Sequence, residues 1–285
     1  MTVPLTDAET PFTVIIPASN ESAWIGPCLD ALLAQTAEAG PMVVILSANA
    51  CQDDTVAQAH RRSAAFAARG SRLVVIDSDI PGKPAALNRA DALAPPGPRA
   101  YLDADVTCAP GLIAALRHAL APRDARYATG RLTLAPARSA VTRRYGRLWM
   151  SLPFHAPGAA PGAGLFAVNP AGRARWQAFP DLISDDSFVR LHFTQAERIE
   201  VTERYLWPLP EGFSNLARVR RRQDAGLDEL RQHHPDLFRK DEATAAPPRL
   251  LLRLLARRPL DLATYLAVRL AARLRPATGG FTRGR

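Results

Sequence analysis

The feature that most constrains the fold of this chain is a series of short, almost continuously apolar segments separated by segments with helical periodicity. The clearest apolar segments are residues 12–17, 42–46, 73–76 and 99–102. Runs of this length with few polar positions are typical of strands that are buried on both faces. Their alternation with helices predicts a mostly parallel sheet flanked by helices on both sides.

Polar side chains gather where these predicted strands end, namely at Ser19, Asn20, Glu21, Asn49, Lys83, Asp103 and Asp105. The carboxyl ends of parallel strands meet at one edge of a sheet, and ligands bind at that edge. Lys83 is the only lysine in the first 217 residues, among 19 arginines. A compact ammonium there suits a phosphate contact, and the alternative is an ordinary surface lysine.

Asp103 and Asp105 lie in the segment Leu102-Asp103-Ala104-Asp105, directly after a predicted strand. In an extended backbone, residues two apart project to the same side, so the two carboxylates can converge. Converging carboxylates repel each other unless a cation lies between them, and hard divalent ions prefer oxygen ligands. The pair therefore predicts a Mg²⁺ or Mn²⁺ site. The alternative is that these acids only cap the following helix.

The middle of the chain holds a second pair of acids. Residues 148–172 carry no charge but contain prolines and glycines throughout, so we expect a loop over 152–161 and a strand over 164–168 rather than a membrane span. This loop is either an acceptor-site wall or a packed connection. Ser184 or Asp185 can cap the next helix. Because Asp186 is a second, adjacent acid, one carboxylate is not needed for capping and could take part in catalysis. Short strands over 199–201 and 205–208 and a helix over 213–232 should follow.

Charge divides the chain into a neutral body and a basic tail. Residues 1–217 hold 20 basic and 20 acidic residues, whereas residues 218–285 hold 16 and 7, so the whole net charge of +9 lies in the tail. A basic tail on a neutral body indicates a local anionic partner such as membrane lipid. It argues against nucleic acid, because no aromatic-interleaved basic patch is present.

The tail predicts two amphipathic helices over 249–276, separated at Pro259. Arginines recur every four residues, at positions 249, 253 and 257 and at 269 and 273. Leucines are expected on the opposite faces, at positions 251, 254 and 255 and at 262, 266, 270 and 274. Such helices can lie in the headgroup layer of an anionic membrane. The alternative is that they fold back onto the body with their arginines in water.

The ordered motifs of residues 12–222 resemble those of a family 2 glycosyltransferase. The opening strand and its turn, Pro17-Ala18-Ser19-Asn20-Glu21, are similar to the family's nucleotide-contacting turn. Asn49 stands where the family usually places an acid against the base. The turn with Lys83, the motif of Asp103 and Asp105, the glycine turn Gly162-Ala163-Gly164 and the pair Asp185-Asp186 complete the resemblance.

The resemblance implies an α/β fold of the GT-A type: a Rossmann-like, mostly parallel sheet flanked by helices, with a C-terminal helical tail. Residues 1–217 would form the glycosyltransferase domain and residues 218–285 a basic helical extension. Donor contacts would come from the first turn, Asn49, Lys83 and Asp103, and acceptor contacts from the glycine turn at 162–164. Asp186 would be the general base, with Asp185 as its orienting neighbour.

The implied reaction is inverting and depends on Mg²⁺ or Mn²⁺, with Asp103 and Asp105 as metal ligands and either His155 or His192 as a third. The expected donor is a nucleotide-diphosphate sugar with UDP as the nucleotide, and the acceptor is a sugar or a lipid-linked molecule. The arginine run at 218–222 occupies the place of the Gln-x-x-Arg-Trp motif of processive members but lacks the tryptophan. We therefore expect single addition.

Three other classes of protein fit the sequence less well. A nucleotidyltransferase would carry a glycine-rich loop with Arg and Lys after the first strand, and residues 17–20 have neither. A nucleic-acid-binding protein conflicts with the neutral body. A catalytically silent scaffold conflicts with the presence of both acidic motifs.

The N-terminus indicates where the protein works. Residues 1–11 include Asp7 and Glu9 and no basic or apolar run, so we expect no signal peptide. The odd number of cysteines, three, suggests reduced thiols. These features predict a cytoplasmic protein, peripheral on the inner face of the membrane if the tail binds lipid.

Overall fold

The computed structural model of the protein describes residues 10–240 and 248–274. They form two compact units, each assembled from separate stretches of the chain. The first unit holds Met1–Thr133, Gly162–Asp181 and Ala196–Trp207, and the second holds Leu134–Pro161, Leu182–Gln195 and Pro208–Arg285. Residues 1–9, on which the expectation about a signal peptide depends, lie outside the described part of the chain.

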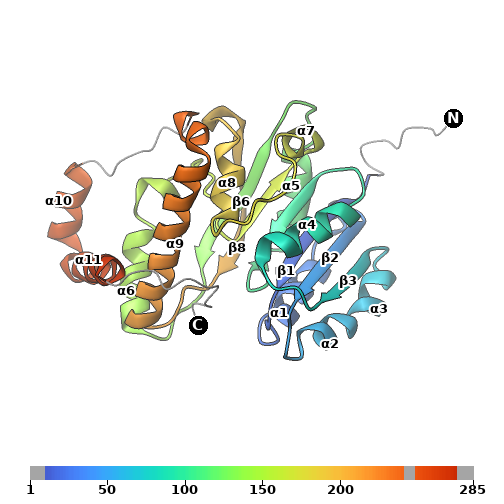
Figure 1. The fold of residues 1–285 in the computed structure, drawn as a ribbon, viewed down its shortest axis with the longest axis horizontal. Coiled ribbons are helices and arrows are strands. Elements are labelled where there is room, and N and C mark those ends of the chain that lie inside the picture. The colour runs from blue at the N-terminus through green and yellow to red at the C-terminus, as the bar shows by residue number, and fades with distance from the viewer. Residues whose placement is uncertain (1–9, 241–247, 275–285) are drawn as a thin grey trace. The chain divides into compact units, whose positions relative to one another are not determined.

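The first unit is built on a sheet, 8-stranded in the described residues, with the strand order β3-β2-β1-β4-β7-β6-β8-β5 (Figure 1). The strands are β1 Phe12–Ala18, β2 Met42–Asn49, β3 Arg72–Ser78, β4 Arg99–Leu102, β5 Thr107–Cys108, β6 Tyr127–Leu134, β7 Leu165–Val168 and β8 Arg198–Trp207. Strands β3, β2, β1 and β4 are parallel neighbours, which confirms the prediction from the apolar segments. Strand β7 runs antiparallel to β4 and β6, and β5 to β8.

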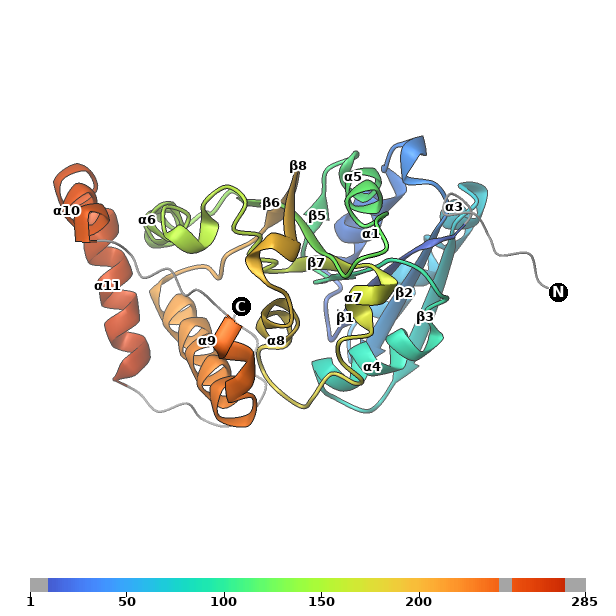
Figure 2. The same cartoon turned by 90° about the horizontal axis from the view of Figure 1, so that it is seen from above.

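Helices cover both faces of the parallel strands, with α4 on one face and α1 and α5 on the other (Figure 2). The helices of this unit are α1 Ile25–Leu33, α2 Thr55–His60, α3 Ser63–Ala68, α4 Lys83–Leu93, α5 Leu112–Ala119 and α7 Pro170–Arg173, with a 3-10 turn at Ala37–Ala39. After Thr55 the chain forms two short helices, α2 and α3, rather than one continuous helix. Arg62, at the break, donates to both carboxylate oxygens of Asp30 in α1, at 2.6 and 2.8 Å.

The core of the unit lies between the parallel strands and these helices. Val14 is paired with Val44, and Ile16 with Leu46, and all four side chains are fully buried. Each such side chain contributes about 1.5–3 kcal/mol relative to an exposed one. The loops that follow these strands are therefore held on a rigid base.

The antiparallel strands differ from expectation. The two short strands predicted over 199–201 and 205–208 are wrong, because a single strand, β8, runs from Arg198 to Trp207. Thr202 and Arg204 are exposed while Tyr205 is fully buried, so this strand alternates between water and core. The polar residues interrupt the apolar pattern without interrupting the backbone pairing.

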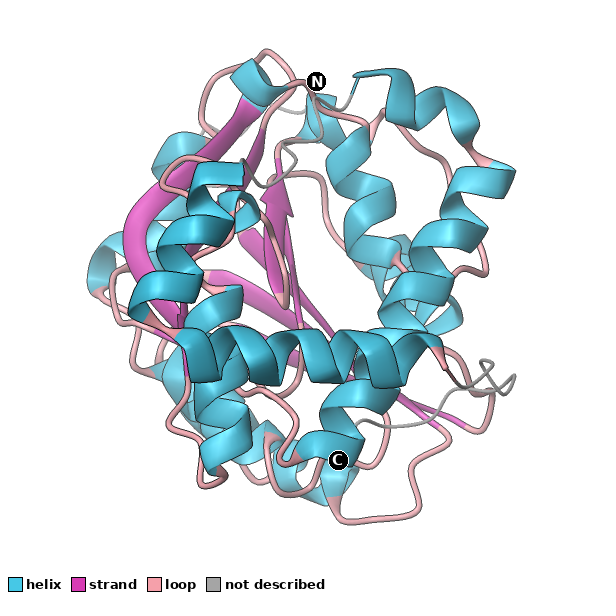
Figure 3. Cartoon of the chain, turned by 90° about the vertical axis from the view of Figure 1, so that its left-hand side faces the viewer, coloured by secondary structure: helices cyan, strands magenta, loops and turns pink. Residues whose placement is uncertain are grey.

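The second unit is helical in its described residues. It contains α6 Ala140–Trp149, α8 Asp185–Leu191, α9 Phe213–His233, α10 Pro248–Arg257 and α11 Pro259–Arg273, with 3-10 turns at Pro153–His155 and Pro235–Lys240. A further 3-10 turn, Gln195–Glu197, lies where the chain passes from the second unit to the first. Helix α11 lies against α6 and α9 (Figures 1 and 3). The predicted separation at Pro259 is confirmed, since proline is well tolerated at the first helical position. The boundary expected between residues 217 and 218 lies inside α9.

Helix α11 is attached at both ends by arginines. Near its start, Arg147 of α6 donates two hydrogen bonds, of 2.7 and 2.9 Å, to the buried carboxylate of Asp261. At its end, Arg221 of α9 donates to the carbonyl oxygens of Ala271 and Ala272, at 3.3 and 3.1 Å. Between these contacts the ring of Tyr265 stacks on Tyr145, with centroids 5.3 Å apart. Helix α11 therefore packs on α6 and α9 of its own unit, and the predicted membrane contact of its exposed side stays a prediction.

The predicted distribution of leucines on α11 is only partly correct. Leu262 is buried together with Tyr265, Val268 and Ala272, but Leu266, Leu270 and Leu274 are exposed. The helix has apolar residues on two sides and buries one of them. In the described residues, no helix is both long and apolar enough to cross a bilayer.

Candidate functional site

The turn after β1 is fastened to the loop after β2. Asn20 adopts φ 51°, a left-handed conformation, and its backbone N–H lies 3.3 Å from Sγ of Cys51. The side-chain oxygen of Asn20 accepts a hydrogen bond from the backbone of Gln52. The Cys51 thiol in turn lies 3.7 Å from the carbonyl of Ala18. The predicted nucleotide turn at Pro17–Glu21 is thus preformed, with Ser19, Asn20 and Glu21 half-buried.

Asp53 ties the same two loops together, a role that the sequence alone did not indicate. Its carboxylate accepts hydrogen bonds from the backbone N–H groups of Ser22 and Thr55, both at 3.1 Å, and from the Thr55 hydroxyl. That hydroxyl also accepts from the Glu21 N–H at 2.7 Å. Burial raises the pKa of Asp53, but the hydrogen bonds from Thr55 and Ser22 outweigh it and hold the pKa below its usual value. Asn49, the last residue of β2, is buried and lies four residues before Asp53 in the sequence.

Lys83 and Asp103 meet at the carboxyl edge of the sheet. Lys83 is the first residue of α4 and follows Gly82, whose φ of 110° suits glycine. Its Nζ lies 2.9 Å from Oδ1 of Asp103, and both side chains are partly exposed. The structure therefore brings two predicted site residues together, with an ammonium already opposite the first carboxylate of the Asp103-Ala104-Asp105 motif.

The loop that carries both aspartates is a tight turn braced by Gly164, the residue directly before β7. The backbone N–H of Asp103 donates to the carbonyl of Gly164 at 2.9 Å, and the N–H of Val106 donates to the carbonyl of Asp103 at 3.1 Å. Asp105, in the middle of this turn, is half-buried. This geometry joins the predicted metal motif directly to the predicted glycine turn.

The glycine turn at 162–164 requires its glycines. Gly162 and Gly164 have φ values of 70° and 76°. A Cβ on Gly162 would lie 1.7 Å from the Tyr127 hydroxyl, and one on Gly164 would lie 2.8 Å from Cδ1 of Trp207. Backbone and aromatic rings approach too closely here for any side chain.

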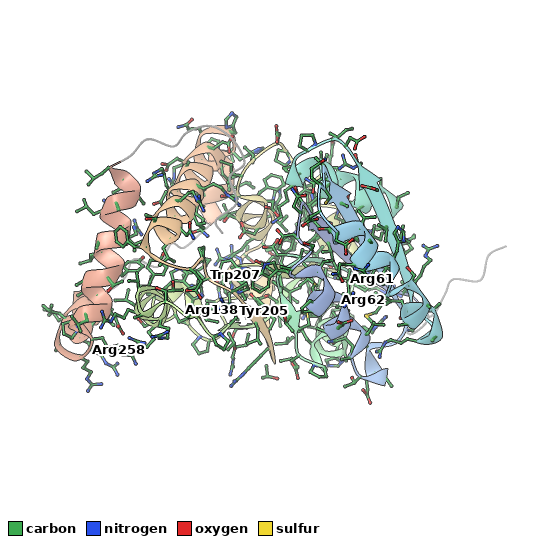
Figure 4. The ribbon with its side chains drawn as sticks, turned by 90° about the horizontal axis from the view of Figure 1, so that it is seen from below. Arg61, Arg62, Arg138, Tyr205, Trp207 and Arg258 are labelled. Carbon is green, nitrogen blue, oxygen red and sulfur yellow. The ribbon has the colours of Figure 1, made fainter. Side chains whose placement is uncertain are left out.

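Two residues of β8, labelled in Figure 4, support this turn from the other side. Tyr205 is fully buried and donates its hydroxyl proton to the carbonyl of Ala163 at 2.7 Å. Burial raises the pKa of Tyr205 well above its usual value, so the phenol stays protonated and remains a donor. Trp207 packs on Gly164. Neither residue was predicted as part of the site, because the sequence pattern of β8 did not show which positions face inward.

The donor set at this edge fits a hard divalent cation that is shared with a phosphate ligand. Two carboxylates on one short turn supply oxygen ligands, the type that Mg²⁺ and Mn²⁺ prefer. Across the described residues, no group of three or more His, Cys, Asp or Glu side chains is arranged to hold a metal. An ion here would therefore complete its shell with phosphate oxygens and water, which is usual for Mg²⁺.

The second acidic pair belongs to the second unit. Asp185 and Asp186 form the first turn of α8, where negative charge is favourable. Asp185 is buried, whereas Asp186 is half-buried and its Oδ1 accepts a hydrogen bond from the Ser187 N–H at 2.6 Å. Ser184, the residue before the helix, makes no side-chain capping bond.

The two candidate histidines also lie in the second unit, in different surroundings. Both ring nitrogens of His155 are buried without a hydrogen-bond partner among the described residues, and its ring contacts Trp149 and Phe154. Burial lowers the pKa of His155 to about 4, so it is a neutral, packed imidazole. Nδ1 of His192 lies 2.8 Å from the carbonyl of Phe188, one helical turn earlier. A third metal ligand stays a prediction.

Comparisons with known proteins agree with this architecture. A family model, Glycosyl transferase family 2, matches residues 13–167, more than half of the chain. The chain is similar in structure to the mannosyltransferase PcManGT from Pyrobaculum calidifontis, solved with GDP-Man and Mn²⁺, at 21% identity and a TM-score of 0.57, covering 96% of this chain and 78% of that one. A search of curated proteins found no match.

Two further solved structures share the fold at lower identity. One is TarS residues 1–349 from S. aureus, at 14% identity and a TM-score of 0.51, with 93% of this chain and 92% of that chain covered. The other is glucosyl-3-phosphoglycerate synthase from Mycobacterium tuberculosis with Mg²⁺ and UDP, at 18% identity and a TM-score of 0.50, with 78% and 80% covered. The expected GT-A type of α/β fold is confirmed. Because the family model matches more than half of the chain, the chain belongs to glycosyl transferase family 2 and is a nucleotide-sugar-dependent glycosyltransferase.

Proposed function

We propose that this protein transfers one sugar from a nucleotide-diphosphate sugar to an acceptor hydroxyl, with inversion and with a divalent cation. The observation that carries the proposal is the cluster at the end of β4. There the Lys83 ammonium lies 2.9 Å from the Asp103 carboxylate, on a turn that Gly164 braces and that also carries Asp105.

On the donor side, Asp103 and Asp105 would hold Mg²⁺ or Mn²⁺ through their carboxylate oxygens. Bound there, the ion supplies positive charge opposite the diphosphate. Lys83 exchanges its contact with Asp103 for a phosphate oxygen and stabilises the charge that develops as the bond from the anomeric carbon to the phosphate oxygen breaks. The turn at Pro17–Glu21 and Asn49 contact the nucleotide.

On the acceptor side, Asp186 accepts the proton of the attacking hydroxyl. One carboxylate oxygen is oriented by the Ser187 N–H, and the other takes the proton. The acceptor oxygen forms its bond to the anomeric carbon on the face opposite the diphosphate, which leaves with the bonding electron pair. Asp185, buried beside it, positions the first turn of α8, and Gly162, Ala163 and Gly164 line the acceptor side.

The finer assignments concern the substrates and the place of action. We assign UDP as the nucleotide and a sugar or a lipid-linked molecule as the acceptor. Single addition is supported by the lack of a tryptophan after the arginine run at 218–222. A lipid-linked acceptor fits a protein that works at the cytoplasmic face of a membrane as a peripheral enzyme.

A donor panel tests the proposal. Thermal shift and donor hydrolysis are measured with UDP and GDP sugars, each with Mn²⁺ and with EDTA, because the similar solved structures carry either UDP or GDP-Man. We expect stabilisation and slow hydrolysis by one donor class, only with the metal. Stabilisation and hydrolysis that are the same in Mn²⁺ and in EDTA would contradict the proposed metal-dependent mechanism.

A further inference from the structure

The outer side of α10 and α11 carries an unusual number of exposed leucines. They are Leu252, Leu255, Leu260, Leu266, Leu270 and Leu274, with between 54% (Leu266) and 73% (Leu274) of each residue exposed. Arginines are exposed beside them, at positions 253, 257, 258 and 273. We call these ten residues the leucine–arginine surface. Figure 4 labels Arg258, at the junction of the two helices.

The leucines on α11 form a stripe separate from the one that holds the helix to its unit. Tyr265, Val268 and Ala272 are buried, and they recur at spacings of three and four. Leu266, Leu270 and Leu274 recur every four residues and follow a different side of the same helix. Burial of the first stripe already accounts for the attachment of α11 to α6 and α9. The exposed stripe therefore has no role in that packing.

Within the described helices α10 and α11, the exposed charges beside these leucines have a single sign. Residues 248–274 contain six arginines and one acid, Asp261. That acid is buried and paired with Arg147, so its charge is compensated inside the unit. Along α10 and α11, exposed leucines and neighbouring guanidinium groups match the two layers of an anionic bilayer surface, with leucines among the acyl chains and arginines at the phosphates.

We propose that the leucine–arginine surface docks on an anionic lipid bilayer. A second copy of the chain is a poorer occupant, because a symmetric contact would bring the same arginines together from both partners. The inference deepens the proposed function and rests on it for its purpose, since docking would bring the enzyme to a lipid-linked acceptor. The exposed leucines and arginines that support docking do not depend on which sugar is transferred.

Flotation of the full chain with lipid vesicles tests the surface. The probes are vesicles of phosphatidylcholine alone and of phosphatidylcholine mixed with phosphatidylglycerol. We expect flotation with the mixed vesicles only. A double variant, Arg253→Gln with Arg257→Gln, should weaken binding roughly 30-fold, since each basic residue near the surface contributes about fivefold. A second double variant, Leu266→Gln with Leu270→Gln, should weaken it roughly 30-fold or more through lost apolar burial.

Matched controls come from the first unit. Leu93 is 56% exposed and Arg72 is also exposed, so Leu93→Gln and Arg72→Gln change the same residue types elsewhere. Both controls should float like the unchanged chain. Equal flotation of all variants would overturn the proposal. The proposal would also be overturned if the unchanged chain did not float and instead formed a dimer, seen by sedimentation velocity, that the leucine variant abolishes.

Donor hydrolysis without vesicles is measured on the same samples. A chain that hydrolyses donor but does not float overturns only the docking surface. A chain that floats but processes no nucleotide sugar overturns only the proposed function.

Discussion

The donor side and the acceptor side of the proposed reaction are supported in different ways. Asp103 and Asp105 lie on a turn between buried strands, with Lys83 and Gly164 bonded to the first of them. Asp186 lies on the first turn of α8, a helix of 7 residues, and its carboxylate accepts a hydrogen bond from the adjacent Ser187. The donor residues are thus braced by long-range contacts, whereas the base is braced locally. Changes on the two sides should therefore separate binding from turnover.

The largest expected effect is on the donor side. Asp103→Ala or Asp105→Ala should lower transfer on the order of 10⁴-fold, because a bound metal contributes several kcal/mol of charge stabilisation. Metal-dependent donor binding, measured by calorimetry, should disappear as well. Asp124→Ala, at an exposed acid of the same unit, is the control. Near-normal transfer by either variant in EDTA would show that the motif holds no metal.

The next effect is confined to turnover. Asp186→Asn should lower kcat by about 10²–10⁴-fold, the usual range for general-base catalysis, while donor affinity is kept. Asp181→Asn, at an exposed acid close by in the sequence, is the control. If Asp185→Asn were inactive and well folded while Asp186→Asn stayed active, the two roles would be exchanged.

A smaller effect concerns the brace of the donor turn. Gly164→Ala should lower the free energy of unfolding by about 3 kcal/mol, from left-handed backbone strain and from overpacking against Trp207 and Val106. Gly70 has a similar φ of 71°, but a Cβ added there would meet nothing within 4 Å, so Gly70→Ala should show the strain alone, about 1–2 kcal/mol. Equal losses in denaturant titrations would mean that the aromatic packing adds no rigidity.

The last effect is the smallest at neutral pH, where it vanishes; it appears only in acid and concerns the loop before the glycine turn. Burial lowers the pKa of His155 from 6.5 to about 4, so the unfolded chain binds this proton first. Its contribution to stability is complete above pH 6.5 and falls by up to about 3 kcal/mol as the pH drops to 4. His155→Leu should remove that part of the pH dependence. His118→Leu, at an exposed histidine, should not. Identical pH profiles would show that His155 is hydrated.

The parallel half of the fold could be predicted because its strands are buried on both faces, so composition alone marks them, as in Val14, Ile15 and Ile16. Strand β8 could not be predicted as one element, since Thr202 and Arg204 face water within it. Arg62, at the break between α2 and α3, pairs with Asp30, which is far from it in the sequence. Long-range contacts of this kind leave no local pattern.

The candidate site shows the same limit. The motif residues at the strand ends could be named because parallel strands bring their carboxyl ends together, and Lys83 does meet Asp103. The supports behind them, Asp53, Tyr205 and Trp207, could not, because their roles depend on loops that meet only in the folded chain. On α11, periodicity marked the leucines as apolar but could not show that only one stripe finds a partner.

The two arginine attachments of α11 have a kinetic consequence. Arg147 holds the start of the helix at Asp261, and Arg221 holds its last carbonyls, so the exposed stripe is presented without a prior opening step. Association with vesicles should then be a single encounter, whose observed rate rises linearly with lipid concentration and does not level off. Lipid capture by this protein would be limited by diffusion and orientation rather than by unmasking of the helix.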